Sequence, residues 1–212
     1  MSGYASIHGT DKNDDINSID FGNRNDYIDA KDGNDTIQSG GGNDIIFAGS
    51  GKDLVYAGSG NDTVYGGAAQ DTLYGGSGND FIDGGNTNDE LYGESGNDTL
   101  IGGQGEDYLE GGSGDDVLTG DGSGGSAKED VFYYESNFGD DTITDFDLKK
   151  DTLEISGDIN DSGIADAADL AIYITEIGGN AVISFPNGDS ITLQGVSRDD
   201  LIAGLDEVVN IV

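Results

Sequence analysis

The sequence predicts an all-β fold, a solenoid in which two parallel sheets face each other and each coil takes 18 residues. From residue 31 to residue 119 the chain repeats with a period of nine, and 38 of its 212 residues are glycine. Each repeat has six Gly-rich residues ending in Asp, typical of a turn, and then a three-residue strand with a central aliphatic side chain. Because one repeat cannot bury that side chain alone, the repeats must stack, two to a coil.

The repeat keeps its register over ten units. Residues 75–83, 102–110 and 111–119 carry the full pattern. The repeat aspartates are Asp35, Asp44, Asp53, Asp62, Asp71, Asp80, Asp89, Asp98, Asp107 and Asp116. The aliphatic residues two positions later are Ile37, Ile46, Val55, Val64, Leu73, Ile82, Leu91, Leu100, Leu109 and Leu118. Matched pairs at one fixed interval are a specific signal that composition alone does not produce.

The charge of the chain excludes several functions. Acidic residues number 43 against 8 basic ones, a formal net charge of −35, so nucleic acid is not an expected partner. The chain has no Cys and a single His, His8, so the sequence predicts neither cysteine chemistry nor a Ser-His-Asp enzyme. No apolar run is long enough for a transmembrane helix. A chain of this charge is expected to stay disordered unless a multivalent cation binds it.

The unit GGSGNDFID at residues 75–83 resembles the RTX nonapeptide G-G-x-G-x-D-x-U-x, a calcium-binding repeat. The resemblance covers about residues 9–135. It implies a right-handed parallel β-roll over residues 31–135, after irregular repeats in residues 1–30. Residues 136–212 are then expected to be a capping and secretion-signal region with a short terminal helix. Within it, residues 138–156 are similar to the segment that closes the roll in serralysin-type proteases and in the R-modules of mannuronan C5-epimerases.

Hard oxygen donors without nitrogen or sulfur ligands suit Ca²⁺. In RTX proteins each ion lies between stacked turns and takes carbonyl and Asp oxygens from both, so the resemblance implies several Ca²⁺ ions. One site would use Gly58, Gly60 and Asp62 with Gly75, Ser77 and Asp80, and the next Gly76, Gly78 and Asp80 with Gly93, Ser95 and Asp98. Neighbouring turns would add Gly40, Gly42, Ala57, Ser59, Gly96, Gly111 and Ser113. The alternative is a set of Asn/Asp-Gly turns without metal, but about ten carboxylates would then stack roughly 5 Å apart without a counterion.

The 18-residue coil sorts the aspartates into two columns. The first column contains Asp26, Asp44, Asp62, Asp80, Asp98 and Asp116, and the second contains Asp35, Asp53, Asp71, Asp89 and Asp107. In the second column Ala69 and Thr87 replace the third Gly of the motif, a position that favours positive φ. We therefore expect weaker or missing calcium around Asp71 and Asp89. The first column also departs from the motif at its start, where Arg24 takes the Gly position.

Aromatic side chains recur on the outer faces. Tyr56, Tyr74 and Tyr92 are 18 residues apart and should form one column, while Phe47 and Tyr65 begin another. These residues are expected either to stiffen the sheets as cross-strand ladders or to offer a stacking platform for a polysaccharide.

The C-terminal third has its own elements. Residues 158–170 resemble a dockerin or EF-hand calcium loop, with Asp158, Asn160 and Asp169 as ligands; the alternative is an Asp-rich loop leading into a strand over residues 170–177. Asp141, Asp145, Asp147 and Asp151 either hold a further ion or form a solvated face. Residues 180–196 predict a hairpin, and residues 197–212 an amphipathic helix with an apolar tail.

Together these features predict a non-catalytic, monomeric calcium-binding module of a secreted bacterial protein. The resemblance implies that it folds on Ca²⁺ outside the cell, that type I secretion machinery is a partner, and that the parent is an enzyme such as an epimerase, lyase, protease or lipase. Two alternatives stay open: an R-module that binds an anionic polysaccharide such as alginate, and a calcium-dependent surface-layer or adhesion spacer.

Overall fold

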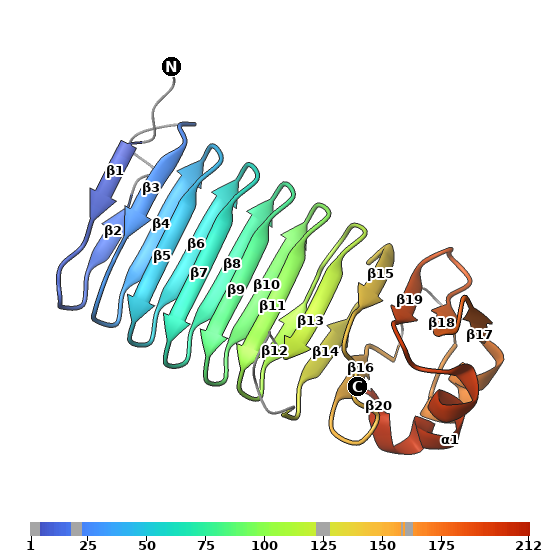
Figure 1. Cartoon of the computed structure of the whole chain (residues 1–212). Helices are drawn as coiled ribbons and strands as arrows, with labels where there is room; N and C mark the ends of the chain where they lie inside the picture. Colours follow the sequence, from blue (N-terminus) through green and yellow to red (C-terminus); the bar gives the residue numbers. More distant parts are fainter. Residues whose placement is uncertain (1–4, 18–22, 122–127, 158, 160–162) are drawn as a thin grey trace.

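A computed structural model of the chain describes residues 5–17, 23–121, 128–157, 159 and 163–212. It is an elongated solenoid in which successive strands alternate between two sheets, with a compact cap at the C-terminal end (Figure 1). In order across the sheet, the first sheet contains β1 (Ala5–His8), β3 (Asp26–Asp29), β5 (Ile45–Ser50), β7 (Thr63–Ala68), β9 (Phe81–Asn86), β11 (Thr99–Gln104), β13 (Val117–Asp121), β15 (Asp140–Ile143), β19 (Ser190–Leu193), β18 (Asn180–Ser184) and β17 (Ile174–Ile177). The second sheet contains β2 (Asp15–Asn17), β4 (Thr36–Gly41), β6 (Leu54–Ser59), β8 (Thr72–Ser77), β10 (Glu90–Ser95), β12 (Tyr108–Glu110), β14 (Val131–Tyr134), β16 (Thr152–Ile155) and β20 (Val209–Ile211). The predicted fold is confirmed.

Strand pairing within the roll is parallel and in register with the repeat. Val55 of β6 pairs with Leu73 of β8, one coil of 18 residues later. The strands are longer than the sequence predicted, six residues instead of three, because the first half of each expected turn still pairs across the sheet, as Gly58 does with Gly76. The remaining turn is therefore a tight three-residue corner that ends at the repeat Asp.

The core is one side chain wide on each sheet. The predicted aliphatic residues from Ile37 to Leu118 are all fully buried between the sheets. Strand residues on either side of them alternate between buried and partly exposed positions, as the two-residue period of a strand requires. Each aliphatic side chain is buried only when the coils before and after it are in place, so stability depends on the stack of coils.

The cap closes the open end of the solenoid. The antiparallel strands β17, β18 and β19 extend the first sheet beyond β15, and β20 extends the second sheet beyond β16. Helix α1 (Arg198–Val208) buries Leu201, Leu205 and Val208 and begins at Ser197, whose side chain accepts a hydrogen bond from the Asp200 N–H. The predicted hairpin and terminal helix are confirmed. No helix among the described residues is long and apolar enough to span a membrane.

One predicted strand in the cap is partly wrong. The expected strand over residues 170–177 is a strand only from Ile174, because residues Ala167–Ile172 form a 3₁₀-helix, η3. A capping box starts that helix: Asp166 and Asp169 each accept a hydrogen bond from the other's backbone N–H. This local hydrogen bonding outweighs the apolar alternation of the sequence.

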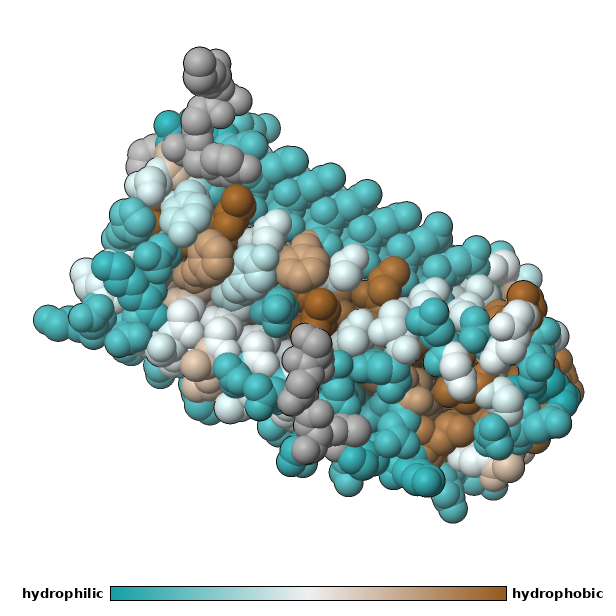
Figure 2. Space-filling model, in the orientation of Figure 1, coloured by the Kyte–Doolittle hydropathy of each residue, from teal (hydrophilic) through white to brown (hydrophobic). Residues whose placement is uncertain are grey.

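The surface reflects the charge of the chain. A hydrophilic band follows one edge of the solenoid along its length, while hydrophobic residues gather over the sheets and the cap (Figure 2). The repeat aspartates themselves are buried at the corners, so the chemistry between the coils decides how so acidic a chain stays folded.

Candidate metal centre

The repeat aspartates form two columns, one along each edge of the solenoid. In the first column the Asp62 N–H donates to Asp80 Oδ1 and the Asp80 N–H donates to Asp98 Oδ1, both at 2.7 Å. In the second column the Asp71 N–H donates to Asp89 Oδ1 at 2.8 Å. One carboxylate oxygen of each Asp is thereby held against the preceding coil.

The second carboxylate oxygen is buried without a partner. The Oδ2 atoms that are inaccessible and accept no hydrogen bond include those of Asp53, Asp62, Asp71, Asp80, Asp89, Asp98, Asp107, Asp116, Asp130 and Asp141. These side chains are at most 3% exposed. A buried charged oxygen without a partner costs several kcal/mol unless it is protonated or meets a cation. Two regular columns of such oxygens therefore mark places for cations.

Burial also changes the acidity of the columns. It raises the pKa of Asp62 and Asp71 to about 7, and that of Asp89 and Asp98 to about 8. The hydrogen bond from the preceding coil works in the opposite direction, and the negative charge of neighbouring column aspartates raises the pKa further. A bound cation would reverse both the burial penalty and the repulsion.

Backbone carbonyls converge on the same spaces between coils. A methyl group placed on Gly75 would lie 2.6 Å from Asp80 Oδ2 and 3.1 Å from the Gly93 carbonyl oxygen, so only glycine leaves room for both donors. The Gly58 carbonyl oxygen likewise faces Gly76 of the next coil. Carboxylate and carbonyl oxygens are the ligands that Ca²⁺ prefers, and the donor set therefore fits this ion.

The structure brings the sequence-predicted ligand pairs together. The Gly60 N–H donates to the Ser77 carbonyl and the Gly78 N–H to the Ser95 carbonyl, both at 2.8 Å. The equivalent pairs are Gly42 with Ser59 and Gly96 with Ser113. Gly40 pairs with Gly58 of the next coil, the Ala57 carbonyl accepts a hydrogen bond from the Ser39 hydroxyl of the preceding coil, and Gly111 lies against Asp116 Oδ2.

Acidic side chains alone do not complete a site. Among the described residues, no three His, Cys, Asp or Glu side chains converge closely enough to hold a metal ion. Any ion in the columns must therefore take most of its ligands from backbone carbonyls, as the glycine corners allow.

Both columns are longer than the sequence predicted. The Asp107 N–H donates to Asp130 Oδ1, and the Asp116 N–H to Asp141 Oδ1. Asp130 in turn donates to Asp151 Oδ1, and at the other end Asp14 donates to Asp35 Oδ1. The nine-residue period conceals these members because the coils at both ends are longer. The signal that remains is an Asp followed two residues later by a buried apolar side chain.

Arg24 and the EF-hand-like loop both depart from the regular repeat. At the start of the first column, Arg24 Nη2 lies 3.9 Å from Asp26 Oδ1, so a guanidinium supplies positive charge there. In the predicted EF-hand-like loop, Asp158 and Asn160 lie outside the described residues. Asp169 is described, and its Oδ2 accepts a hydrogen bond from the Ala165 N–H at 2.9 Å as part of the cap of η3.

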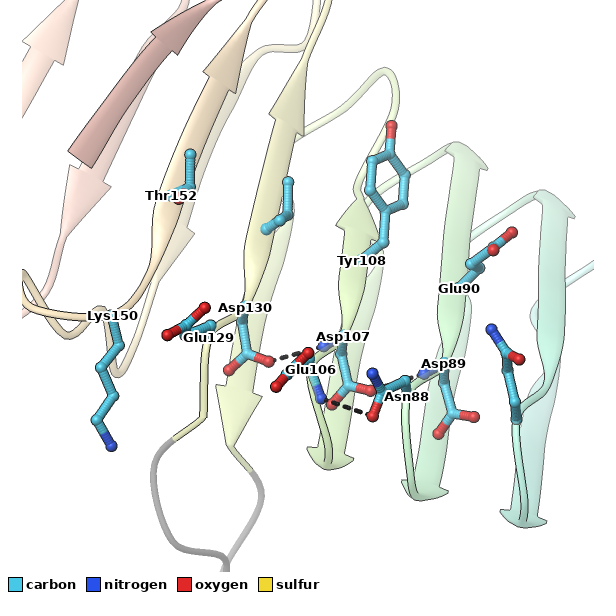
Figure 3. Close-up of a pocket in the computed structure, with 12 residues that line it drawn as sticks. Asn88, Asp89, Glu90, Glu106, Asp107, Tyr108, Glu129, Asp130, Lys150 and Thr152 are labelled. Carbon is cyan, nitrogen blue, oxygen red and sulfur yellow. Dashed lines mark hydrogen bonds between the residues drawn. The ribbon is translucent and has the colours of Figure 1, made fainter. Parts of the chain in front are cut away.

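A cavity of about 380 Å³ lies beside the second column (Figure 3). Asp89, Asp107 and Asp130 line its inner side, one from each of three successive coils. Its other lining residues include the exposed side chains of Gln70, Asn88, Glu106, Glu129 and Lys150. The cavity therefore borders the second column, although its aspartates are almost fully buried.

The outer faces carry the predicted aromatic columns. Tyr74 stacks on Tyr56 with a ring-centroid distance of 4.9 Å and on Tyr92 with 4.6 Å, and both pairs are within 9° of parallel. The column continues to Tyr108 and Tyr133. The neighbouring tyrosines cover both ring faces of Tyr74, so these faces are not free to stack on a sugar. The arrangement therefore favours a ladder that stiffens the sheet over a polysaccharide-binding platform that runs the length of the column.

Comparison with known proteins agrees with this geometry. The family model of the RTX calcium-binding nonapeptide repeat matches in four copies, at residues 22–55, 48–82, 56–91 and 83–118. No curated protein matches the chain in sequence. Among solved structures, the extracellular lipase LipA from Serratia marcescens is similar in fold, with a TM-score of 0.51 and 22% identity over 100% of this chain and 41% of the lipase. The chain thus spans less than half the length of that lipase. Residues 22–118 thus match the RTX calcium-binding nonapeptide repeat, and the described part of this range, residues 23–118, builds a two-sheet β-roll.

Proposed function

We propose that the chain is the non-catalytic calcium-binding module of a secreted bacterial protein, and that Ca²⁺ is what allows it to fold. The observation that carries this proposal is the pair of columns of buried, unpartnered Asp oxygens. In water the same oxygens would be solvated, so without cations the coiled state is penalised at every corner. With cations, each corner gains an ionic contact that the unfolded chain lacks.

The side chains of the columns supply the expected cooperativity. Asp80 offers Oδ1 toward the coil of Asp62 and Oδ2 toward the Gly93 carbonyl of the following coil. An Asp placed in this way can contact ions on both sides, so filling one inter-coil space prepares the next. The bound ion supplies charge neutralisation, and its binding free energy becomes folding free energy. Extracellular calcium modules have Kd values on the order of 10⁻⁴ to 10⁻³ M.

The proposed setting is secretion through a type I system. Where calcium is scarce the columns repel and the chain stays unfolded, a state suited to export; outside the cell, calcium folds the module and stabilises its parent protein. The RTX repeats and the likeness to an extracellular lipase support this setting.

Far-ultraviolet circular dichroism tests the proposal directly. The full chain is unfolded in chelator and then titrated with CaCl₂, with MgCl₂ as the control cation. A steep gain of β signal with calcium, and a much weaker response to magnesium, is expected. A spectrum that is the same in chelator and in excess calcium would overturn the proposal.

Binding of an anionic polysaccharide such as alginate is a second candidate. Tyr56, at the N-terminal end of the tyrosine column, is 40% exposed and lines a cavity with Gln38, Gly40 and Gly58. The net charge of −35 opposes an acidic sugar unless calcium bridges the two. Titration with alginate oligomers in calcium, with Tyr56→Ala as the comparison, tests it: binding that Tyr56→Ala abolishes supports this function, and no binding refutes it.

A further inference from the structure

The two columns differ in the backbone of their corners. At the position of the third motif Gly, Gly60 and Gly78 of the first column have φ values of 126° and 127°. In the second column Ala69 and Thr87 occupy this position with φ of 74°. Residues with a Cβ cannot adopt the glycine value, so these two corners turn the preceding peptide by about 50° relative to the others.

The corners at Ala69 and Thr87 also lack a backbone hydrogen bond that joins the coils at the regular corners. The Gly60 and Gly78 N–H groups each donate to the carbonyl of the next coil at 2.8 Å. Gly51, in a regular corner of the second column, donates to the Ala68 carbonyl at 2.9 Å. Among the hydrogen bonds of the described residues, none joins the Ala69 or Thr87 N–H to the next coil. The carbonyls predicted to face an ion at these corners are therefore held less firmly.

A second ladder, formed by the residue before each Asp, is broken at the same place. In the first column the Asn61 N–H donates to Asn43 Oδ1 and the Asn79 N–H to Asn61 Oδ1, both at 3.1 Å. In the second column the Lys52 N–H still donates to Asn34 Oδ1, and the Glu106 N–H to Asn88 Oδ1. Between these two rungs the ladder is interrupted, because Lys52 and Gln70 meet only through Lys52 Nζ and Gln70 Oε1. The first column is thus closed by a continuous amide ladder and the second is not.

The acidic cavity lies where the second column is irregular. It begins at Gln70 and Asn88 and reaches the buried Asp89 and Asp107 (Figure 3). The unpartnered Oδ2 atoms of both aspartates are themselves inaccessible, and the cavity lies directly beside them. An ion in this part of the column can replace a missing carbonyl ligand by a water molecule, which Ca²⁺ accepts readily.

We propose that the two columns bind calcium as two unequal classes of site, and that Ala69 and Thr87 set the lower affinity of the second. The first column fills at lower calcium and folds the roll. The second column fills afterwards, with water in the coordination shell of the ions near Asp71 and Asp89. This inference rests on the proposed function, since it grades the affinity of the same columns.

Calcium titration of three full-length proteins by isothermal calorimetry, with circular dichroism in parallel, tests the inference. The proteins are the wild type, the double variant Ala69→Gly/Thr87→Gly, and the control Ala68→Gly, which makes the same kind of change at the last residue of β7, where φ is not positive. In the wild type we expect two classes of site. The double variant should bind about fivefold or more tightly in the weaker class, because the strain is relieved. The control should change either class by about twofold at most.

The outcomes distinguish a failure of the two-class inference from a failure of the proposed calcium-binding function. The inference is also supported if calcium binds only the first column in the wild type and both columns in the double variant. A single class of sites in the wild type overturns it, and so does a weaker class that the double variant leaves unchanged, even if all three proteins fold with calcium. If none of the three binds calcium or changes its spectrum, the proposed function itself fails and the inference falls with it.

Discussion

Each repeat Asp occupies a position that only a cation or a proton can satisfy. Asp80 shows this: Oδ1 accepts a hydrogen bond from the preceding coil at 2.7 Å, while Oδ2 is buried with no partner. Asparagine would keep the hydrogen-bonding oxygen but lose the charge. The repeat Asp is therefore a residue whose native protonation state depends on what lies between the coils.

Asp80→Asn is expected to weaken calcium binding by about tenfold, because the number of charged ligands sets the affinity of oxygen-only sites. It should also lower the number of ions bound, since Asp80 faces two inter-coil spaces. Calorimetric titration measures both quantities. Asp206→Asn in the exposed part of α1 makes the same charge change far from the columns and should leave both unchanged. Equal effects of the two variants would show that the bulk charge, and not the column, is what matters.

Without calcium, stability should fall as the pH rises. Burial raises the pKa of Asp62 from its ordinary 3.8 to about 7 and that of Asp98 to about 8. The folded chain then holds more protons than the unfolded chain, so the contribution of these groups is fully present below pH 3.8 and is lost as the pH rises through 7 to 8.

Calcium replaces those protons in the folded chain, so in saturating calcium the loss of stability over the same pH window should disappear. Circular dichroism titrations at several pH values between about 5 and 8 check both trends. A calcium-free fold that gains stability toward pH 8, or the same loss of stability with pH in chelator and in saturating calcium, would contradict this account of the columns.

The strand and its corner form the unit of the structure, and the sequence predicts this unit well. The period of nine identifies the buried aliphatic residues and the repeat aspartates without error from Asp35 to Asp116. The period could not identify Asp130 and Asp141, because the coils before them are longer and hydrogen bonding between coils, not spacing, aligns them. The period also predicted strands that are too short, because pairing between strands continues into Gly-rich residues that are typical of turns. The capping box of η3 lay within the Asp-rich segment 158–170, where the same aspartates resembled ligands of a calcium loop.

Tyr74→Ala tests whether the tyrosine column stiffens the second sheet. Tyr74 has stacked neighbours on both faces, so its loss should lower the free energy of unfolding of the calcium-bound chain by about 1 to 2 kcal/mol. The number of calcium ions bound should not change. Thr72→Ala, on the outer face of the same strand, is the control and should have a smaller effect. Denaturant unfolding in excess calcium measures the difference, and a Tyr74→Ala variant as stable as the control would refute the stiffening role.

The whole molecule behaves as a one-dimensional stack whose parts depend on shared ions. Its net charge of −35 includes the two columns of repeat aspartates, and each 18-residue coil adds one buried carboxylate to each column. The cap ends the stack by adding strands to both sheets, so the calcium-bound chain is expected to be a monomer. Sedimentation velocity should show one compact monomeric species in calcium and a more expanded monomer in chelator. Calcium-dependent oligomers would instead favour the surface-layer or adhesion spacer.

The central claim, that divalent ions occupy the spaces between coils, can be observed directly. A crystal structure of the chain grown with millimolar CaCl₂ and never exposed to a chelator should show anomalous difference density between the carboxylates of Asp62 and Asp80 and at the equivalent spaces of the first column. Ordered coils with no ion density between them would contradict the account.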